Sequence, residues 1–261
     1  AWPGGQLEPG HRLVPGDSHL AGVNEPGVTA PDDVADITGG VVTEYYNFRN
    51  EIGEIPGGLT GTQRAYSVIT EEQKQMAREI FDMYSRYSGI QFIERVNPTP
   101  LDLLSPFDPE LNDIIVTTGD LQIFGNSSDP GGIIGLAGPV LMNANQGLLI
   151  LRVAAMDQAE SWSNLSGDAP GENGGPQQSW YVTAMHEIGH QLGLGHSYDL
   201  VSQTVQGSDP ALSTSIPESA FPGAADIIHM QHLYRPDSKD IDMYRMDVNQ
   251  NGTLSVETMA E

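Results

Sequence analysis

The apolar positions of the chain fall into short runs that indicate strands and longer stretches with helical spacing. Four runs are either rich in β-branched and aromatic residues or alternate between apolar and polar positions, and they are predicted to be strands: 41–48, 90–94, 113–118 and 148–153. The segment 131–139 is apolar, rich in glycine and ends on Pro139. Because proline cannot donate a hydrogen bond within a sheet, this segment is predicted to be an edge strand.

Two longer helices are predicted within this pattern. The first follows a Gly-rich loop after the first strand, and it begins at Thr70, whose spacing to Gln73 matches a capping box. Its apolar residues recur at intervals near 3.6, and Gly89 is placed to end it. The second helix follows a polar loop over 157–178. Ser179 can cap it, and its many apolar positions predict that it is buried.

The two ends of the chain differ from its middle. Residues 1–40 are rich in Gly, Pro and Asp without periodicity, which predicts an extended arm, a pro-segment remnant or a linker. The middle, 41–236, closes with a short amphipathic helix predicted over 225–234. The segment 241–257 alternates on both sides of an Asn-Gly turn, which predicts a hairpin. Since an isolated hairpin is barely stable, 237–261 is predicted to be a linker and the start of a second, β-rich domain.

Charge and cysteine content exclude several classes of function. The 261 residues carry 35 acidic against 11 basic side chains, a formal charge of −24, so nucleic acid and anionic membranes are not expected partners. No apolar run approaches the roughly 20 residues that span a bilayer. The absence of cysteine excludes disulfides, thiolate metal sites and thiol nucleophiles. We expect a monomer, secreted after removal of a signal peptide that this chain lacks.

The chemistry is concentrated in one stretch, His-Glu-Ile-Gly-His-Gln-Leu-Gly-Leu-Gly-His over 186–196. On a helix, His186 and His190 lie on one face and can bind one metal ion, while Glu187 can reach a water on that ion. Gly193 can adopt positive φ, end the helix and let His196 approach from another side. Three neutral histidines leave a fourth position open, as a catalytic zinc site requires. A chance match of even the first five residues is expected in fewer than about one in a hundred such chains.

These residues match every fixed position of the extended motif of the metzincin metallopeptidases, and the chain resembles their matrixin-like branch over roughly 41–236. The resemblance implies an α+β catalytic domain with a twisted, mostly parallel five-stranded sheet, an antiparallel edge strand, an active-site helix and a C-terminal helix. It also implies a zinc-dependent endopeptidase in which His186, His190 and His196 bind Zn²⁺ and Glu187 is the general base. The tail over 237–261 is similar to the start of the β-sandwich domains that follow many secreted bacterial peptidases.

The resemblance further implies how substrate is bound. A protein or peptide substrate would lie as an extended strand along the edge strand, which is the usual mode of strand addition. The candidate substrate-binding residues are Ile133, Ile134, Gly135 and Leu136, with Tyr198 as part of the pocket wall beyond the scissile bond.

Calcium is a second expected ion, since oxygen ligands are abundant. Matrixin-like chains often place calcium loops where Asp129, Asp157 and Glu160 stand here, although acids of solvated loops are a close alternative. The segment 247–252 also resembles part of an EF-hand loop. Its twelfth position is Thr258 instead of glutamate, so the hairpin is favoured there.

The chain also departs from the family pattern. The first methionine after the third histidine is Met230, and Gln206 stands in the region where the methionine turn of the family is expected. No histidine lies between His19 and His186, so a second, structural zinc site is not expected. The missing methionine leaves a rival hypothesis, a catalytically degenerate zinc- or peptide-binding module. The intact Glu187 argues against it, because a pure binding site needs no base.

Overall fold

The computed structural model describes twelve parts of the chain: residues 2–3, 11–12, 43–58, 61–88, 90–121, 134–144, 147–163, 178–195, 204–206, 221–223, 226–227 and 230. Several predictions fall outside them, among them the hairpin over 241–257, most of the arm over 1–40, and four candidate site residues, Asp129, Ile133, His196 and Tyr198. Of the short helix predicted over 225–234, the described residues Asp226, Ile227 and Met230 are helical.

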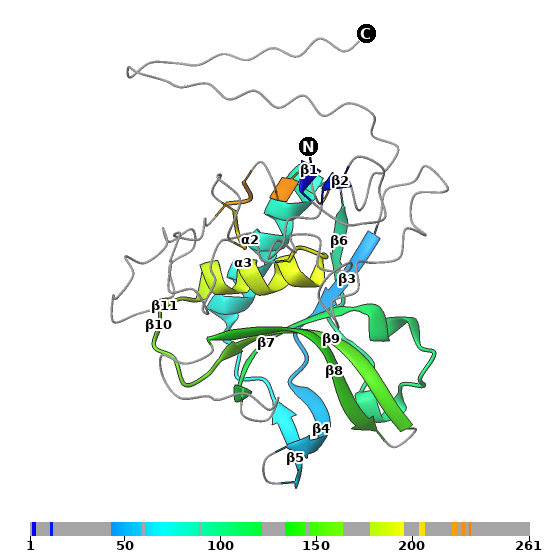
Figure 1. The fold of residues 1–261 in the computed structure, drawn as a ribbon. Coiled ribbons are helices and arrows are strands. Elements are labelled where there is room, and N and C mark those ends of the chain that lie inside the picture. Colours follow the sequence, from blue (N-terminus) through cyan, green and yellow to red (C-terminus); the bar gives the residue numbers. More distant parts are fainter. Residues whose placement is uncertain are drawn as a thin grey trace, which may run out of the picture.

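A large sheet and two helices form the described domain (Figure 1). The strands of the large sheet are β3 (Thr43–Asn47), β4 (Glu51–Gly58), β5 (Gly61–Tyr66), β6 (Gln91–Glu94), β7 (Ile114–Gly119), β8 (Gly135–Ala144) and β9 (Gly147–Asp157). The helices are α2 (Glu71–Ser88) and α3 (Trp180–Gln191), with short 3₁₀ turns at η2 (Leu101–Leu103) and η3 (Pro109–Asn112). Two pairs of two-residue strands complete the list: β1 (Trp2–Pro3) with β2 (His11–Arg12), and β10 (Trp162–Ser163) with β11 (Gln178–Ser179).

The strand order of the large sheet is β5-β4-β8-β9-β7-β3-β6. Strands β9, β7, β3 and β6 are mutually parallel, and β8 runs antiparallel to β9 along its whole length. The predicted five-stranded, mostly parallel sheet with an antiparallel strand at one side is therefore confirmed. Beyond β8 the sheet continues into the β4–β5 hairpin, which joins β8 through the pair Glu54 and Asn143. The remainder of β8 pairs with β9 alone within the described part of the chain.

The β4–β5 hairpin corrects one prediction. Residues 51–66 form paired antiparallel strands, whereas the sequence predicted a Gly-rich loop between the first strand and the first helix. The apolar pattern missed it because, of the three hairpin side chains that the structure describes, Ile52 joins a hydrophobic core, whereas Glu51 and Tyr66 are exposed. Strand pairing itself is made by backbone hydrogen bonds, which leave no periodic signal in the sequence.

Helix α2 begins at the predicted capping box. The Thr70 hydroxyl accepts a hydrogen bond from the Gln73 backbone N–H at 3.2 Å, and the Gln73 side-chain oxygen accepts one from the Thr70 N–H at 3.0 Å. Two orphan donors of the first turn are thereby satisfied. The apolar face of α2 packs on the sheet, where Phe81 stacks on Tyr46 with ring centroids 4.0 Å apart.

Helix α3 is buried on all sides. Each of its twelve residues is buried, because the helix packs against β7, β8 and β9 and against α2. Both helices lie on the same side of the sheet (Figure 1). Ser179 caps α3 as predicted, its hydroxyl accepting from the Val182 N–H at 3.3 Å. The opposite face of the sheet carries a second core, to which η2 contributes Leu101.

One buried chain of hydrogen bonds joins the starts of the two helices. The Trp180 indole N–H donates to the Thr118 hydroxyl at 2.9 Å, and that hydroxyl donates to the side-chain oxygen of Gln73 at 3.0 Å. This is the same oxygen that caps α2. Within the described residues, no helix is apolar and long enough to cross a membrane.

Candidate metal centre

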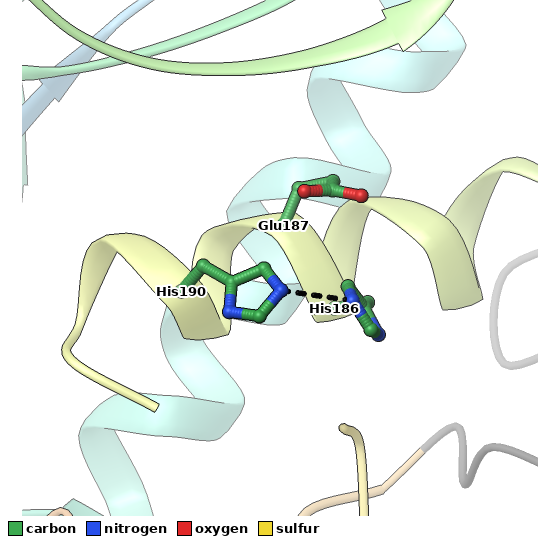
Figure 2. Close-up of side chains that lie close together, drawn as sticks. All are labelled: His186, Glu187 and His190. Atoms are coloured by element: carbon green, nitrogen blue, oxygen red, sulfur yellow. Dashed lines mark hydrogen bonds between the residues drawn. The ribbon is translucent and has the colours of Figure 1, made fainter. Parts of the chain in front are cut away.

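Helix α3 brings three potential ligands together. One ligand atom each of His186, Glu187 and His190 lies within 4.8 Å of the others, and all three residues are buried. Figure 2 shows the two imidazoles side by side on one face of the helix, with Glu187 projecting from a different face. Among the residues that the structure describes, this is the one such cluster of His, Asp and Glu side chains.

The end of α3 orients His190. Gly193 has the predicted positive φ, 94°, and the helix closes in a Schellman motif: the Gly193 N–H donates to the carbonyl of His190, and the Leu194 N–H to that of Gly189, both at 3.0 Å. The same turn places the Leu194 carbonyl 2.6 Å from His190 Nδ1. Since a carbonyl oxygen can only accept, Nδ1 carries a proton and Nε2 points away from this turn.

A distant segment orients His186 in the same way. Its Nδ1 lies 3.0 Å from the carbonyl oxygen of Val205, so this nitrogen also carries the proton. The Val205 N–H in turn donates to the Asp226 carboxylate at 3.0 Å, and the Gly223 N–H donates to the same oxygen at 2.7 Å. Both imidazoles are thus fixed through Nδ1 by backbone carbonyls, the arrangement typical of histidines that bind metal through Nε2.

The electrostatics of the pair indicate a cation. The two Nε2 atoms lie at the hydrogen-bond distance of 3.0 Å (Figure 2), although both Nδ1 atoms already carry a proton. Two imidazole nitrogens this close repel each other unless a positive charge, either a proton or a metal ion, lies between them. Two nitrogens bound to one tetrahedral zinc at about 2.0–2.1 Å are roughly 3.4 Å apart, so the imidazoles fit a shared zinc ion with a small outward shift.

Glu187 is seated against β8. A Cβ atom added to Gly135 would lie 2.4 Å from Glu187 Oε1 and 2.8 Å from the Thr183 methyl group, so the carboxylate packs where Gly135 has no side chain. The carboxylate therefore lies between the metal-binding helix and the strand beside it. Its direction differs from that of the histidines, as the one-residue offset in sequence predicts.

The other predicted site residues are only partly brought together. Ile134, Gly135 and Leu136 are half-buried, with Ile134 directly before β8 and the other two at its start. Gly135 faces α3, whereas Leu136 packs against the core on the opposite face of the sheet. Asp157 and Glu160 share the turn after β9, where Asp157 Oδ1 accepts from the Ala159 N–H at 3.0 Å. The calcium site remains a prediction.

Several contributors to the centre were not predicted. They are the carbonyls of Leu194 and Val205, the Asp226 carboxylate that anchors Val205, and Gly135 as the seat of Glu187. Of these groups, only the Leu194 carbonyl could have been predicted from the sequence, because Leu194 directly follows Gly193, the residue predicted to end the helix. The contacts of Val205 join residues 19 and 21 positions apart, which no local pattern reports.

The mostly parallel sheet, its antiparallel strand and a buried helix with His-Glu-x-x-His define the metzincin class of zinc metallopeptidase domains. The family model described as matrixin matches residues 60–235, and the chain therefore belongs to the matrixin family of metallopeptidases. The predicted resemblance is confirmed. No curated protein matches the chain. The β-sandwich domain expected after the catalytic domain remains a prediction.

Proposed function

We propose that the protein is a zinc-dependent endopeptidase that hydrolyses peptide bonds with Glu187 as the general base. The observation that carries the proposal is the buried cluster on α3, in which a carboxylate lies within 4.8 Å of two imidazoles whose Nε2 atoms are 3.0 Å apart. A centre that only held metal would not need a buried carboxylate beside its ligands, because removing a charged group from water is costly.

The residues of the cluster have separate roles in this proposal. His186 and His190 hold the ion through Nε2, and a bound zinc supplies an activated water and polarises the scissile carbonyl. Glu187 accepts a proton from the attacking water and passes it to the leaving amine, the general base and acid role of a positioned carboxylate. Its seat against Gly135 excludes water from one side of the carboxylate and restricts its rotamers.

The third ligand is proposed to be His196. The Schellman motif at Gly193 turns the chain back toward the helix, and the Leu194 carbonyl already contacts the His190 ring. Residue 196 follows only two positions later. This course of the chain supports a ligand that approaches the ion from outside α3.

The substrate is proposed to bind as an extended strand beside β8. Support comes from the pairing of β8: its Gly135 end is bonded to β9 on one side, and in the described part of the chain no strand pairs with its other side. Unpaired backbone groups of such a strand can bind a peptide main chain. We further propose that the enzyme acts outside the cell, where its high acidic charge keeps it soluble and calcium is abundant.

Cleavage of casein or of a random peptide library tests the proposal. Activity is expected with zinc, should disappear with a chelator and return when zinc is restored. Glu187→Gln should keep one equivalent of zinc and lose activity, whereas Glu79→Gln on helix α2, a matched change outside the cluster, should keep both. Zinc bound at one equivalent by an inactive wild-type protein would overturn the enzyme and favour a binding module.

A further inference from the structure

Gln206 is a buried glutamine in contact with the backbone of the metal-binding helix. It is fully buried, and its side-chain N–H donates to the carbonyl oxygen of His186 at 2.6 Å. Its backbone N–H donates to the Thr204 hydroxyl at 3.3 Å, so the short segment 204–206 is held in a turn of its own. The neighbouring residue Val205 accepts from the His186 ring. Two consecutive residues therefore hold the same histidine, one at its imidazole and the other at its backbone.

The helix is shaped to receive this amide. A Cβ atom added to Gly189 would lie 2.6 Å from the Gln206 side-chain nitrogen and 3.0 Å from the Tyr84 hydroxyl. The amide thus occupies the space that a side chain at position 189 would fill. Gly189 stands between the two histidines in the sequence, so Gln206 packs on the backbone that directly joins the two ligands.

The stability of the fold does not explain the amide. The Gln206 side-chain oxygen is buried and has no hydrogen-bond partner among the described residues. A buried acceptor without a partner destabilises the protein, and an apolar side chain of the same length would avoid that cost. The amide donor, in contrast, has a well-defined acceptor at the metal centre. The hydrogen bond to the His186 carbonyl is therefore the interaction that favours glutamine at this position.

We propose that Gln206 is a positioning residue of the metal centre, which sets the direction of the His186 ring by holding the His186 carbonyl. With the ring held at Nδ1 by Val205 and the backbone held by Gln206, His186 cannot shift along the helix axis without breaking one of the two bonds. The position of its Nε2 atom relative to that of His190 is then fixed from outside the helix. The inference rests on the proposed zinc site, but it concerns residues that do not touch the ion.

Cobalt-substituted protein tests this role, because the visible absorption of Co²⁺ reports the geometry of its ligands. Gln206→Met keeps the length of the side chain and removes the donor. It should change the cobalt spectrum and weaken binding of cobalt and zinc, measured by chelator competition, about tenfold or more, as loss of a group that orients a ligand commonly does. Gln73→Met is the matched control: it removes another buried amide, on α2, and should lower stability while leaving the spectrum and the metal affinity unchanged.

The outcomes separate this inference from the proposed function. A wild-type protein that gives no cobalt spectrum and binds no zinc would overturn the metal centre and the inference together. A normal wild-type spectrum that Gln206→Met leaves unchanged, at unchanged affinity, would overturn the inference alone. If Gln206→Met does not fold, Gln206→Asn replaces it. That variant retains an amide one methylene too short to reach the His186 carbonyl, and the same spectral change and loss of affinity are expected.

Discussion

Because the Glu187 carboxylate packs against Gly135, we expect one methyl group added at position 135 to have a large effect on the rate of hydrolysis. In Gly135→Ala the new Cβ would lie 2.4 Å from Glu187 Oε1, whereas ordinary van der Waals contact begins near 3.4 Å. The carboxylate must therefore retreat by about 1 Å, and a displacement of this size costs on the order of 100-fold in rate when it moves a catalytic group. That factor corresponds to about 2.7 kcal/mol in the activation free energy.

The assay separates chemistry from metal binding. We expect kcat for a peptide substrate to fall about 100-fold in Gly135→Ala. Zinc content should stay at the wild-type level, because the imidazoles of His186 and His190 project from another face of α3. The added methyl also crowds the helix, so the free energy of unfolding in urea should fall by about 1–3 kcal/mol.

A second substitution identifies the group that is displaced. The new Cβ would also lie 2.8 Å from the Thr183 methyl group, which Thr183→Ser removes while retaining the hydroxyl that donates to the Ser179 carbonyl. In the double variant, Gly135→Ala with Thr183→Ser, stability should recover in part while kcat stays low. A kcat within threefold of wild type in Gly135→Ala would refute the reasoning, since it would show that the position of Glu187 against β8 does not limit the reaction.

Three further predictions concern stability. Gly193→Ala forces alanine into a positive φ of 94° and should cost about 1–2 kcal/mol in urea unfolding; no loss would contradict the closing turn of α3. Arg152→Met removes the guanidinium that donates to the last carbonyl of α3, on Gln191, at 2.5 Å, and should cost about 2 kcal/mol, whereas Arg152→Lys should recover part of it. Burial raises the pKa of Tyr46 and of Tyr181 from 10.0 to about 12, with a nearby carboxylate adding to the rise in each case. Because the folded state holds these protons more tightly, its stability should be unaffected by these groups below pH 10 and fall as the pH rises from about 10 to 12. Absorbance at 295 nm should show late ionisation of two of the nine tyrosines, which the double change to phenylalanine removes; complete ionisation near pH 10 in the folded protein would contradict it.

The parts of the fold that the sequence predicts are those set by local rules. The capping box at Thr70, the cap at Ser179 and the helix end at Gly193 each depend on bonds within a few residues, and each is found in the structure. The buried strands also leave a clear signal, since every residue of β7 is buried and its sequence is a continuous apolar run followed by threonines. The β4–β5 hairpin was missed because its stability depends on backbone pairing that composition does not report.

The candidate metal centre likewise combines groups that local rules predict with groups that they do not. Spacing on one helix predicts that His186, Glu187 and His190 come together, because the helix alone determines their relative positions. The groups that orient them arrive from elsewhere in the chain. Val205 and Gln206 lie 19 and 20 positions from His186 in the sequence, so their roles follow from tertiary packing that a single sequence does not encode in any short pattern.

The hydrogen-bond chain from Trp180 through Thr118 to Gln73 has a consequence for the dynamics of the domain. The first turns of α2 and α3 share it, so neither helix can open at its start without exposing polar groups at the start of the other. Such coupling makes the two starts one cooperative unit of local unfolding. In native-state hydrogen exchange, the amides of Gln73 and Val182, whose acceptors are the two capping hydroxyls, should therefore exchange with similar opening free energies. The helix that carries the candidate metal ligands would then be protected from its beginning by its contact with α2.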